Sequence, residues 1–249
     1  MQAAIKACFS GLLEGTAEAA RAPLGHAPAD ACLGGGLRLA SLHEVFSEGG
    51  SEAAASGFAL ALALRALDRR KWLMWVRQDF SALENGEIHG SGLLELGIDP
   101  GGVLMVRAPD ALAVLRAGAE GLACKGVGAV IIEAWGKSRV FDLAASRRLT
   151  LAAQRYGVTV IALRFGAEPE PSAAETRWLV KAAPSHTEDW GAPIFDAALT
   201  RNRHGGCGHW VMEWDCNNGT FSETHSGALA AAPFDRPAAT AVEGLRQAG

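Results

Sequence analysis

The residues with the clearest chemical implication form a loop between an apolar strand at 42–46 and an Ala/Leu-rich helix that continues to residue 64. In this layout, backbone N–H groups and a helix N-terminus bind nucleotide phosphates, helped by a Lys and by a Ser or Thr on magnesium. Residues 42–64 contain no Lys, and Glu48 and Glu52 put negative charge beside the loop. We therefore predict a nucleotide-binding frame without its charge chemistry, whose degenerate loop is Ser47, Glu48, Gly49, Gly50 and Ser51.

Two polar residues follow buried strands at points where a P-loop ATPase keeps catalytic groups. Glu133 ends the apolar strand 127–132, where an Asp helps to hold magnesium in such enzymes. Gln78 follows the strand 72–76, and a glutamine can orient a water but cannot accept its proton. We expect Glu133 to be a solvated residue at a strand end and Gln78 not to be catalytic. The chain is thus predicted not to be an enzyme and to need no cofactor.

The densest basic cluster after residue 160 is Arg201, Asn202, Arg203 and His204, between two predicted strands. Arginine forks match a phosphate or the acidic groups of a protein partner, and a solvated hairpin turn is the alternative. Tryptophans near strand ends are more often core or interface residues than platforms for single-stranded bases. Partner-binding candidates are Arg201, Arg203, Trp210 and Trp214.

Metal and disulfide chemistry are not expected. His204, Cys207, His209 and Cys216 have a spacing that fits no common structural zinc pattern. The five cysteines are scattered and never spaced as CxxC, which fits a reducing compartment. No run of residues is apolar and long enough to span a bilayer, and the N-terminus lacks a signal-peptide pattern. We expect a soluble, cytoplasmic protein.

The order of apolar segments predicts the fold class. Strand and helix alternate four times between residues 42 and 163, and the strands lack polar alternation, as in a parallel sheet covered by helices. Residues 78–88 are predicted to be a polar connection. Three strands at 177–182, 194–200 and 210–214 have no helices between them, which predicts an antiparallel extension. The fold class is therefore α/β, with a mostly parallel sheet flanked by helices.

Composition sets the boundaries of the folded core. The 249 residues are 49 % hydrophobic and carry a formal net charge of −4, which argues against a basic surface for duplex nucleic acid. Residues 2–21 have a helical apolar stripe, and residues 22–33 contain Pro and Gly and are predicted to be a linker. The prediction is an N-terminal helix and linker at 1–33, a core at 34–222 and a flexible tail at 223–249.

Taken together, these segments resemble the core domain of the bacterial recombinase RecA over about residues 33–221. Residues 47–57 take the place of its P-loop, Gln78 that of its catalytic Glu, and Glu133 that of its metal-binding Asp. The Arg201-Asn202-Arg203 stretch falls where RecA has Lys-Asn-Lys, which reaches a neighbouring subunit's ATP. A shortened RecA-like chain with a Trp-rich strand, Trp210-Val211-Met212-Glu213-Trp214, is similar to the ImuA family of the damage-induced mutagenesis cassette.

This resemblance implies a non-catalytic adaptor in SOS-induced translesion DNA synthesis. Its implied partners are RecA, the Y-family protein ImuB and an error-prone C-family DNA polymerase, with DNA contacted only indirectly.

Three alternatives stay open. A divergent active ATPase would need a Lys from elsewhere, with Lys71, Lys125 and Lys137 as candidates. A cell-division inhibitor of the SulA type is a shorter relative of the same fold. Direct binding of single-stranded DNA would show a steep salt dependence.

Overall fold

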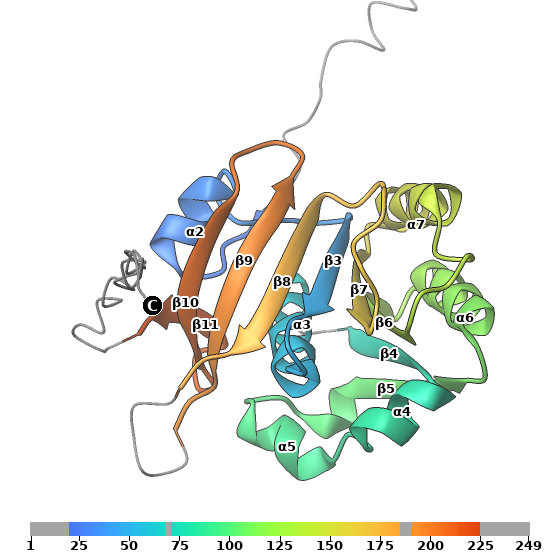
Figure 1. Cartoon of the computed structure of the whole chain (residues 1–249), viewed down its shortest axis with the longest axis horizontal. Helices are drawn as coiled ribbons and strands as arrows, with labels where there is room; N and C mark the ends of the chain where they lie inside the picture. Colours follow the sequence, from blue (N-terminus) through green and yellow to red (C-terminus); the bar gives the residue numbers. More distant parts are fainter. Residues whose placement is uncertain (1–19, 68–70, 185–190, 225–249) are drawn as a thin grey trace, which may run out of the picture.

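A nine-stranded sheet forms the centre of the structure, a computed structural model that describes residues 20–67, 71–184 and 191–224 (Figure 1). β8, β3, β7, β6, β4 and β5 are mutually parallel, and antiparallel pairing adds β9, β10 and β11. The predicted α/β class with a mostly parallel sheet is confirmed. In spatial order the strands are β11 (Thr220–Glu223), β10 (Gly208–Asp215), β9 (Ile194–Asn202), β8 (Thr176–Ala182), β3 (Leu42–Ser47), β7 (Thr159–Phe165), β6 (Val127–Trp135), β4 (Trp72–Gln78) and β5 (Val103–Ala108).

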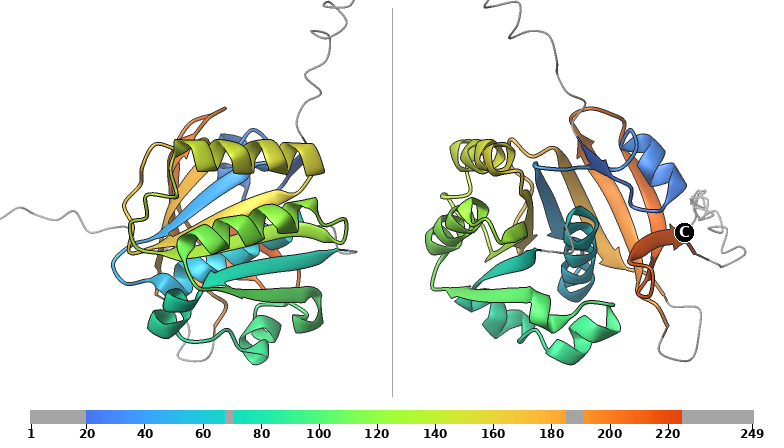
Figure 2. Two further views of the ribbon diagram at one scale, coloured as in Figure 1. Left: turned by 90° about the vertical axis from the view of Figure 1, so that its right-hand side faces the viewer. Right: turned by 180° about the vertical axis from the view of Figure 1, so that it is seen from behind.

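Helices cover both faces of the parallel part of the sheet, which is why most of its strands are buried and rich in apolar residues. On one face, α3 (Glu52–Ala66) packs over β8, β3, β7 and β6. On the other face, α6 (Ala111–Ala123) packs over β5, β4 and β6, and α7 (Leu143–Tyr156) over β7 and β3 (Figure 2). Asp110 and Asp142 cap the N-termini of α6 and α7 by accepting backbone N–H bonds of 2.8 and 2.7 Å.

An aromatic cluster joins α3 to the antiparallel strands. The ring of Phe58 on α3 lies 5.2 Å from that of Trp178, 5.6 Å from Phe195 and 5.3 Å from Phe221, measured between centroids. Phe58 and Trp178 are fully buried. Because the partners come from β8, β9 and β11, this one helix residue fixes three strands to the core.

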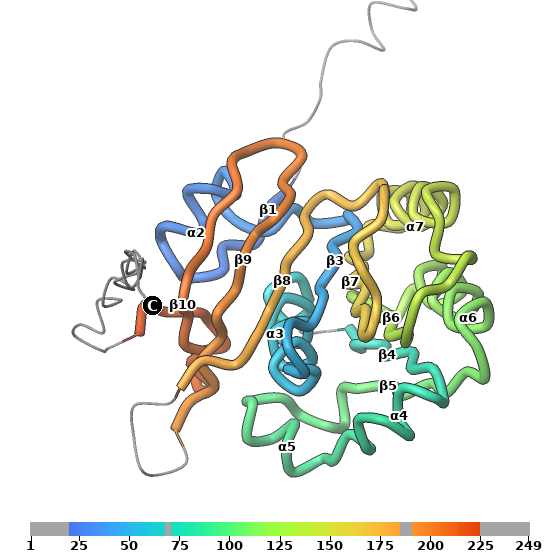
Figure 3. The backbone as a smooth tube through the Cα atoms, viewed as in Figure 1, coloured from blue at the N-terminus to red at the C-terminus, as the bar shows by residue number. Residues whose placement is uncertain are grey.

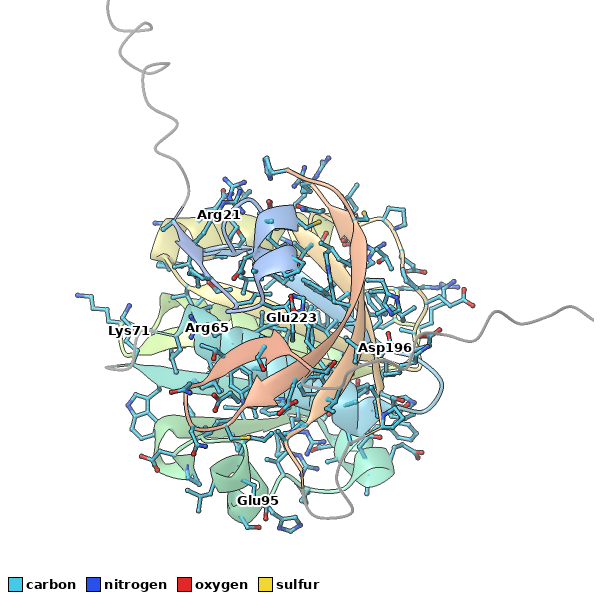
Figure 4. The ribbon with its side chains drawn as sticks, turned by 90° about the vertical axis from the view of Figure 1, so that its left-hand side faces the viewer. Arg21, Arg65, Lys71, Glu95, Asp196 and Glu223 are labelled. Carbon is cyan, nitrogen blue, oxygen red and sulfur yellow. The ribbon has the colours of Figure 1, made fainter. Side chains whose placement is uncertain are left out.

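The predicted linker at 22–33 is wrong, because this segment contains β1 (Arg21–Ala22) and α2 (Ala27–Cys32) and packs on the core. Pro28 is tolerated in the first turn of α2, where no helical hydrogen bond is lost. β1 pairs with β2 (Leu37–Arg38) in a separate small sheet, and α2 lies beside β10 (Figure 3). Arg65 donates to the carbonyls of Pro23 at 2.7 Å and Gly219 at 3.0 Å and so joins both ends of the core (Figure 4).

The connection after β4 also differs from its prediction. Residues 78–88, predicted to be a polar connection, contain α4 (Asp79–Asn85). They are followed by α5 (Gly90–Glu95) and the short 3₁₀ helix η1 (Pro100–Gly102). Ser81 and Ala82 of α4 are buried, whereas Phe80 and Leu83 are exposed. The segment looked like a polar loop because only a narrow side of each short helix meets the core.

The strand β8 was expected to belong to the antiparallel extension but pairs in parallel with β3. Residues 166–175 carry the chain from the carboxyl edge of the sheet back to its amino edge, and ten extended residues span that distance. The antiparallel extension therefore begins one strand later, at β9.

Several predictions fall on residues outside the described ranges. They include most of the N-terminal helix predicted at 2–21 and the tail from residue 225. Among the described helices, none is long and apolar enough to cross a membrane. The core extends to Glu223, the last residue of β11, and to the segment before residue 34 that packs on it.

Candidate functional site: a degenerate phosphate-binding edge

The loop Ser47–Ser51 joins the carboxyl end of β3 to the N-terminus of α3, the point at which α/β folds bind phosphates. Gly49 and Gly50 have φ angles of +61° and +79°, which favour glycine. The Ser51 side chain makes no capping hydrogen bond to the helix. The Glu48 carboxylate lies in this loop, 3.7 Å from the Lys181 ammonium. The turn therefore contains two glycines with positive φ and carries a carboxylate beside the N-terminus of α3.

None of the three lysines considered for an active ATPase pairs with a residue of this loop. Lys71 and Lys125 precede β4 and β6 and therefore lie toward the amino edge of the sheet, away from the loop. Figure 4 shows Lys71 on the opposite side of the molecule from Asp196. Lys137 follows β6 at the correct edge but pairs with Glu170 at 3.3 Å.

The lysine that does approach the loop is Lys181 on β8, which was not considered as a candidate. Its ammonium pairs with Asp196 at 3.5 Å as well as with Glu48. Two carboxylates therefore neutralise it. A lysine on a neighbouring strand forms no sequence motif with the loop. Lys181 lies near the loop because β8 pairs in parallel with β3, with Val180 opposite Ser47.

Glu133 is the most informative residue of this edge. It is fully buried within β6, which continues to Trp135, so the expectation of a solvated strand-end residue is wrong. Its Oε2 accepts from Trp75 Nε1 and from Arg77 Nε, both at 2.8 Å. Its Oε1 accepts from Arg77 Nη2 at 3.0 Å and from the Ser81 hydroxyl. Four donors occupy both oxygens of a buried carboxylate, which leaves no exposed oxygen for a metal ion.

Arg77 completes this buried pair from the neighbouring strand. It aligns with Glu133 in the parallel register of β4 and β6. Its remaining Nη1 donates to the Gly86 carbonyl at 3.1 Å, so the guanidinium also holds the end of α4. The sequence held a signal for this contact, because Arg77 is a charge inside an otherwise apolar strand.

Gln78 has a structural role as the residue that precedes α4. Its Oε1 accepts the backbone N–H of Trp135 at 3.1 Å and so joins the ends of β4 and β6. This bond uses one lone pair of the amide oxygen and neither donor of the amide NH₂ group. The Gln78 side chain therefore helps to hold the two strand ends together.

A groove of about 430 Å³ lies beside the loop, between the first turns of α3 and the α4–α5 segment. Glu52 and Glu87 line it, and its arginine, Arg77, is already held by Glu133. Glu87 is itself paired with Arg77, at 3.8 Å, and with Arg107. The rest of the lining is largely apolar, with Leu60, Trp75 and Leu93 among its residues.

Two arginines, Arg164 near the carboxyl end of β7 and Arg177 near the amino end of β8, are used inside the protein. Arg177 binds Glu44 through Nε and Nη2, both at 2.8 Å. Arg164 is 6 % exposed and lies over the ring of Phe141, 4.2 Å from its centroid. Its Nε has no hydrogen-bond partner among the described residues, and burial lowers the pKa of this guanidinium. These contacts keep the strand ends together.

The basic cluster lies at the other edge of the sheet and fixes the crossover loop. Arg201 Nη1 donates to the Ser172 carbonyl at 2.8 Å, and Arg203 Nη1 to the Ala173 carbonyl at 3.2 Å. Arg203 is exposed and Arg201 half-buried, so each keeps further donors for another contact. The cluster borders a polar pocket of about 380 Å³ that also includes Arg38, Glu175 and His204.

The two tryptophans proposed for partner binding differ in their surroundings. Trp214 is 1 % exposed, and its indole N–H donates to the Leu96 carbonyl at 3.0 Å. This side chain is part of the core, which corrects its assignment to a contact surface. Trp210 is half-buried beside Trp178, with 6.1 Å between the ring centroids.

The four residues considered for zinc have separate partners. The His204 imidazole contacts Glu175, and that of His209 contacts Asp196. The Cys216 thiol lies beside the Trp214 carbonyl, and Cys207 is exposed. Within the described ranges, no cluster of three potential ligand residues forms.

A buried histidine beneath the polar pocket gives a pH-dependent prediction. His43 Nε2 donates to the Arg38 carbonyl at 2.9 Å, and its Nδ1 accepts from the Thr176 hydroxyl at 2.8 Å, which requires the neutral ring. Burial lowers the pKa of His43 to about 4, although the Arg38 carbonyl and Glu175 act in the opposite direction.

Because the unfolded chain binds this proton more readily, the stabilisation is complete above pH 6.5 and falls as the pH drops from 6.5 toward 4. We expect the free energy of unfolding to fall by about 3 kcal/mol between pH 6.5 and pH 4 because of His43. Urea unfolding of the protein and of His43→Gln at a series of pH values measures the difference. Equal slopes for both proteins would contradict the prediction.

The chain was also compared with known proteins. No protein-family model matches it, and no curated protein sequence matches it. The structure establishes an α/β architecture with helices on both faces of a mostly parallel sheet. The likeness to RecA and to the ImuA family rests on the order of segments in the sequence.

Proposed function

We propose that this protein is a non-catalytic adaptor in damage-induced translesion DNA synthesis. It binds RecA in the cytoplasm and works with an ImuB-type partner and an error-prone C-family polymerase. It contacts DNA only through these proteins. The family resemblance supports the cellular role, and the chemistry of the sheet edge supports the absence of catalysis.

The observation that carries the non-catalytic part is the buried Glu133 carboxylate. A metal ligand must offer an oxygen to the ion, and both oxygens here are occupied by Trp75, Arg77 and Ser81. The loop beside it has Glu48 in place of a phosphate-binding charge. Phosphoryl transfer depends almost entirely on such positioning and charge, and their absence here supports the proposal of a non-catalytic protein.

The contact surface for RecA includes Arg201 and Arg203. Both side chains hold the crossover loop by one nitrogen each, and each guanidinium has further donors beyond that bond. Carboxylates on a partner would accept hydrogen bonds from the remaining N–H groups of Arg201 and Arg203, because planar guanidinium groups bind carboxylates in pairs of hydrogen bonds.

ATP binding and RecA binding test the two halves of this proposal. We expect no binding of a labelled ATP analogue with magnesium, and no hydrolysis beyond that of RecA itself. We expect Arg201→Ala with Arg203→Ala to weaken binding to RecA on single-stranded DNA about tenfold or more. The control is Arg147→Ala with Arg155→Ala, which removes two exposed arginines of α7.

The outcomes separate the alternatives. ATP hydrolysis by the protein alone would support a divergent ATPase. Unchanged RecA binding by the Arg201/Arg203 variant would remove these residues from the contact surface. Binding of single-stranded DNA that weakens steeply with salt would favour a direct DNA binder.

A further inference from the structure

A groove of about 500 Å³ lies between α6 and α7, which run side by side on the face of the sheet opposite α3 (Figure 2). Its floor is apolar and includes Leu112 and Leu115 of α6, Val140 of the loop before α7, and Leu149 of α7. Leu112 is 41 % exposed, whereas Leu115 and Leu149 are buried beneath the surface. The groove therefore offers apolar side chains that no other part of the described chain covers.

Three arginines stand around this floor. Arg116 comes from α6, Arg148 from α7 and Arg139 from the loop before α7. All three are exposed, and none has an ion pair or hydrogen bond to another residue in the described part of the chain. The one carboxylate of the lining, Asp142, caps α7 by accepting the N–H of Ala145 through Oδ1. The groove thus has three guanidinium groups whose donors are unused.

Positive charge is concentrated in this part of the chain. Residues 137–157 contain five basic residues and one acid, although the whole chain has a formal net charge of −4. On α6, Arg116 and Glu120 are the charged residues, and Glu120 does not line the groove. Because a cluster of unpaired cations attracts the opposite charge, the complementary ligand is acidic.

The apolar floor distinguishes between kinds of acidic ligand. Among the described residues that line the groove there is no aromatic side chain on which a base of single-stranded nucleic acid could stack. Duplex nucleic acid is held mainly through its phosphates and would leave the leucines unused. A lipid surface is bound by apolar side chains that project into it, whereas these lie recessed between two helices. A peptide with both carboxylates and apolar side chains uses every group that the groove offers.

We propose that the groove binds an acidic amphipathic helix of a protein partner. Apolar side chains of that helix, repeated at helical spacing, lie on Leu112, Leu115 and Leu149. Its carboxylates flank this apolar stripe and bind Arg116 on one helix and Arg148 on the other, because guanidinium groups pair well with carboxylates. This surface is separate from the Arg201–Arg203 turn, so the proposal does not depend on the RecA-binding function.

A fluorescent synthetic peptide tests the proposal on the full chain. The peptide has about 18 residues, enough for five helical turns, with leucines on one face and glutamates on the others. We expect saturable binding by fluorescence anisotropy with a dissociation constant below about 100 μM at low salt. Raising the salt to about 500 mM should weaken it, because the charges are screened. Peptides with Lys in place of Glu, or Ala in place of Leu, should bind about tenfold more weakly or less.

Variants of the protein locate the binding site. Arg116→Glu with Arg148→Glu should raise the dissociation constant about tenfold or more. Leu112→Asp should also weaken binding, and its exposed position keeps the fold intact, which circular dichroism checks. The matched control, Arg147→Glu with Arg155→Glu, makes the same charge change on α7 outside the groove lining and should leave binding within about twofold.

Three results would overturn the proposal. The first is no saturable binding of the Leu/Glu peptide, and the second is binding that the Arg116/Arg148 variant leaves intact. The third is another occupant of the same groove. A single-stranded oligonucleotide that displaces the peptide would indicate nucleic acid, and self-association lost in the Arg116/Arg148 variant would indicate a second copy of this chain.

Discussion

Replacing Glu133 with Ala lowers the free energy of unfolding by about 3–5 kcal/mol. The substitution removes a buried carboxylate and leaves the Arg77 guanidinium, which is 3 % exposed, without its counter-charge. The donors of Trp75 and Ser81 lose their acceptor at the same time. Urea denaturation at neutral pH, followed by tryptophan fluorescence and by circular dichroism, measures the loss.

A double variant separates the free-energy cost of an unpaired Arg77 from the net stability that the Arg77–Glu133 pair contributes. Arg77→Met with Glu133→Leu removes both charges and should recover most of the lost stability, since buried ion pairs are often no better than apolar residues of similar size. Glu95→Ala, which removes an exposed carboxylate, should change stability by less than about 0.5 kcal/mol. A loss below about 1 kcal/mol for Glu133→Ala would mean that water reaches this site.

Replacing Phe58 with Ala costs about 3–5 kcal/mol of unfolding free energy. The substitution opens a cavity at the centre of the aromatic cluster, where Trp178, Phe195 and Phe221 surround the ring. Because these partners lie on three strands, the void cannot be filled by a shift of one side chain. Thermal and urea unfolding measure the effect.

The control for Phe58 is Leu151→Ala on α7, where the side chain is 65 % exposed. We expect this variant to lose less than about 0.5 kcal/mol. Near-ultraviolet circular dichroism should change for Phe58→Ala, because the surroundings of Trp178 become less rigid. An equal loss of stability in the two variants would contradict the central role of the cluster.

The buried strands could be predicted from the sequence because parallel strands covered on both faces appear as apolar runs. β3, β4, β6 and β7 lie within a few residues of the predicted positions. The short helices α2 and α4 could not be predicted in the same way. Six or seven residues give too few turns for a helical period, and Pro28 and Gly25 made the first of them resemble a loop.

The absence of a Lys from the loop between β3 and α3 could be read from the sequence, but the contacts of the charged residues around this loop could not. The missing Lys between residues 42 and 64 is visible in the sequence. The contact between Arg77 and Glu133 depends on the register of β4 against β6, across 56 residues of chain. Lys181 reaches Glu48 only because β8 turns back to pair in parallel with β3. Such long-range pairings are set by topology and leave no local period.

The central position of β3 has a consequence for how the chain folds as it is made. Its neighbours are β7 and β8, and the contact of Glu44 with Arg177 spans 133 residues. The Leu24 carbonyl accepts a hydrogen bond from the N–H of Phe221, which is near the end of the core and is synthesised later still. The first strand of the main sheet therefore leaves the ribosome long before its neighbours exist. Long-range pairings of this kind slow folding and prolong the time for which unpaired strand edges are exposed.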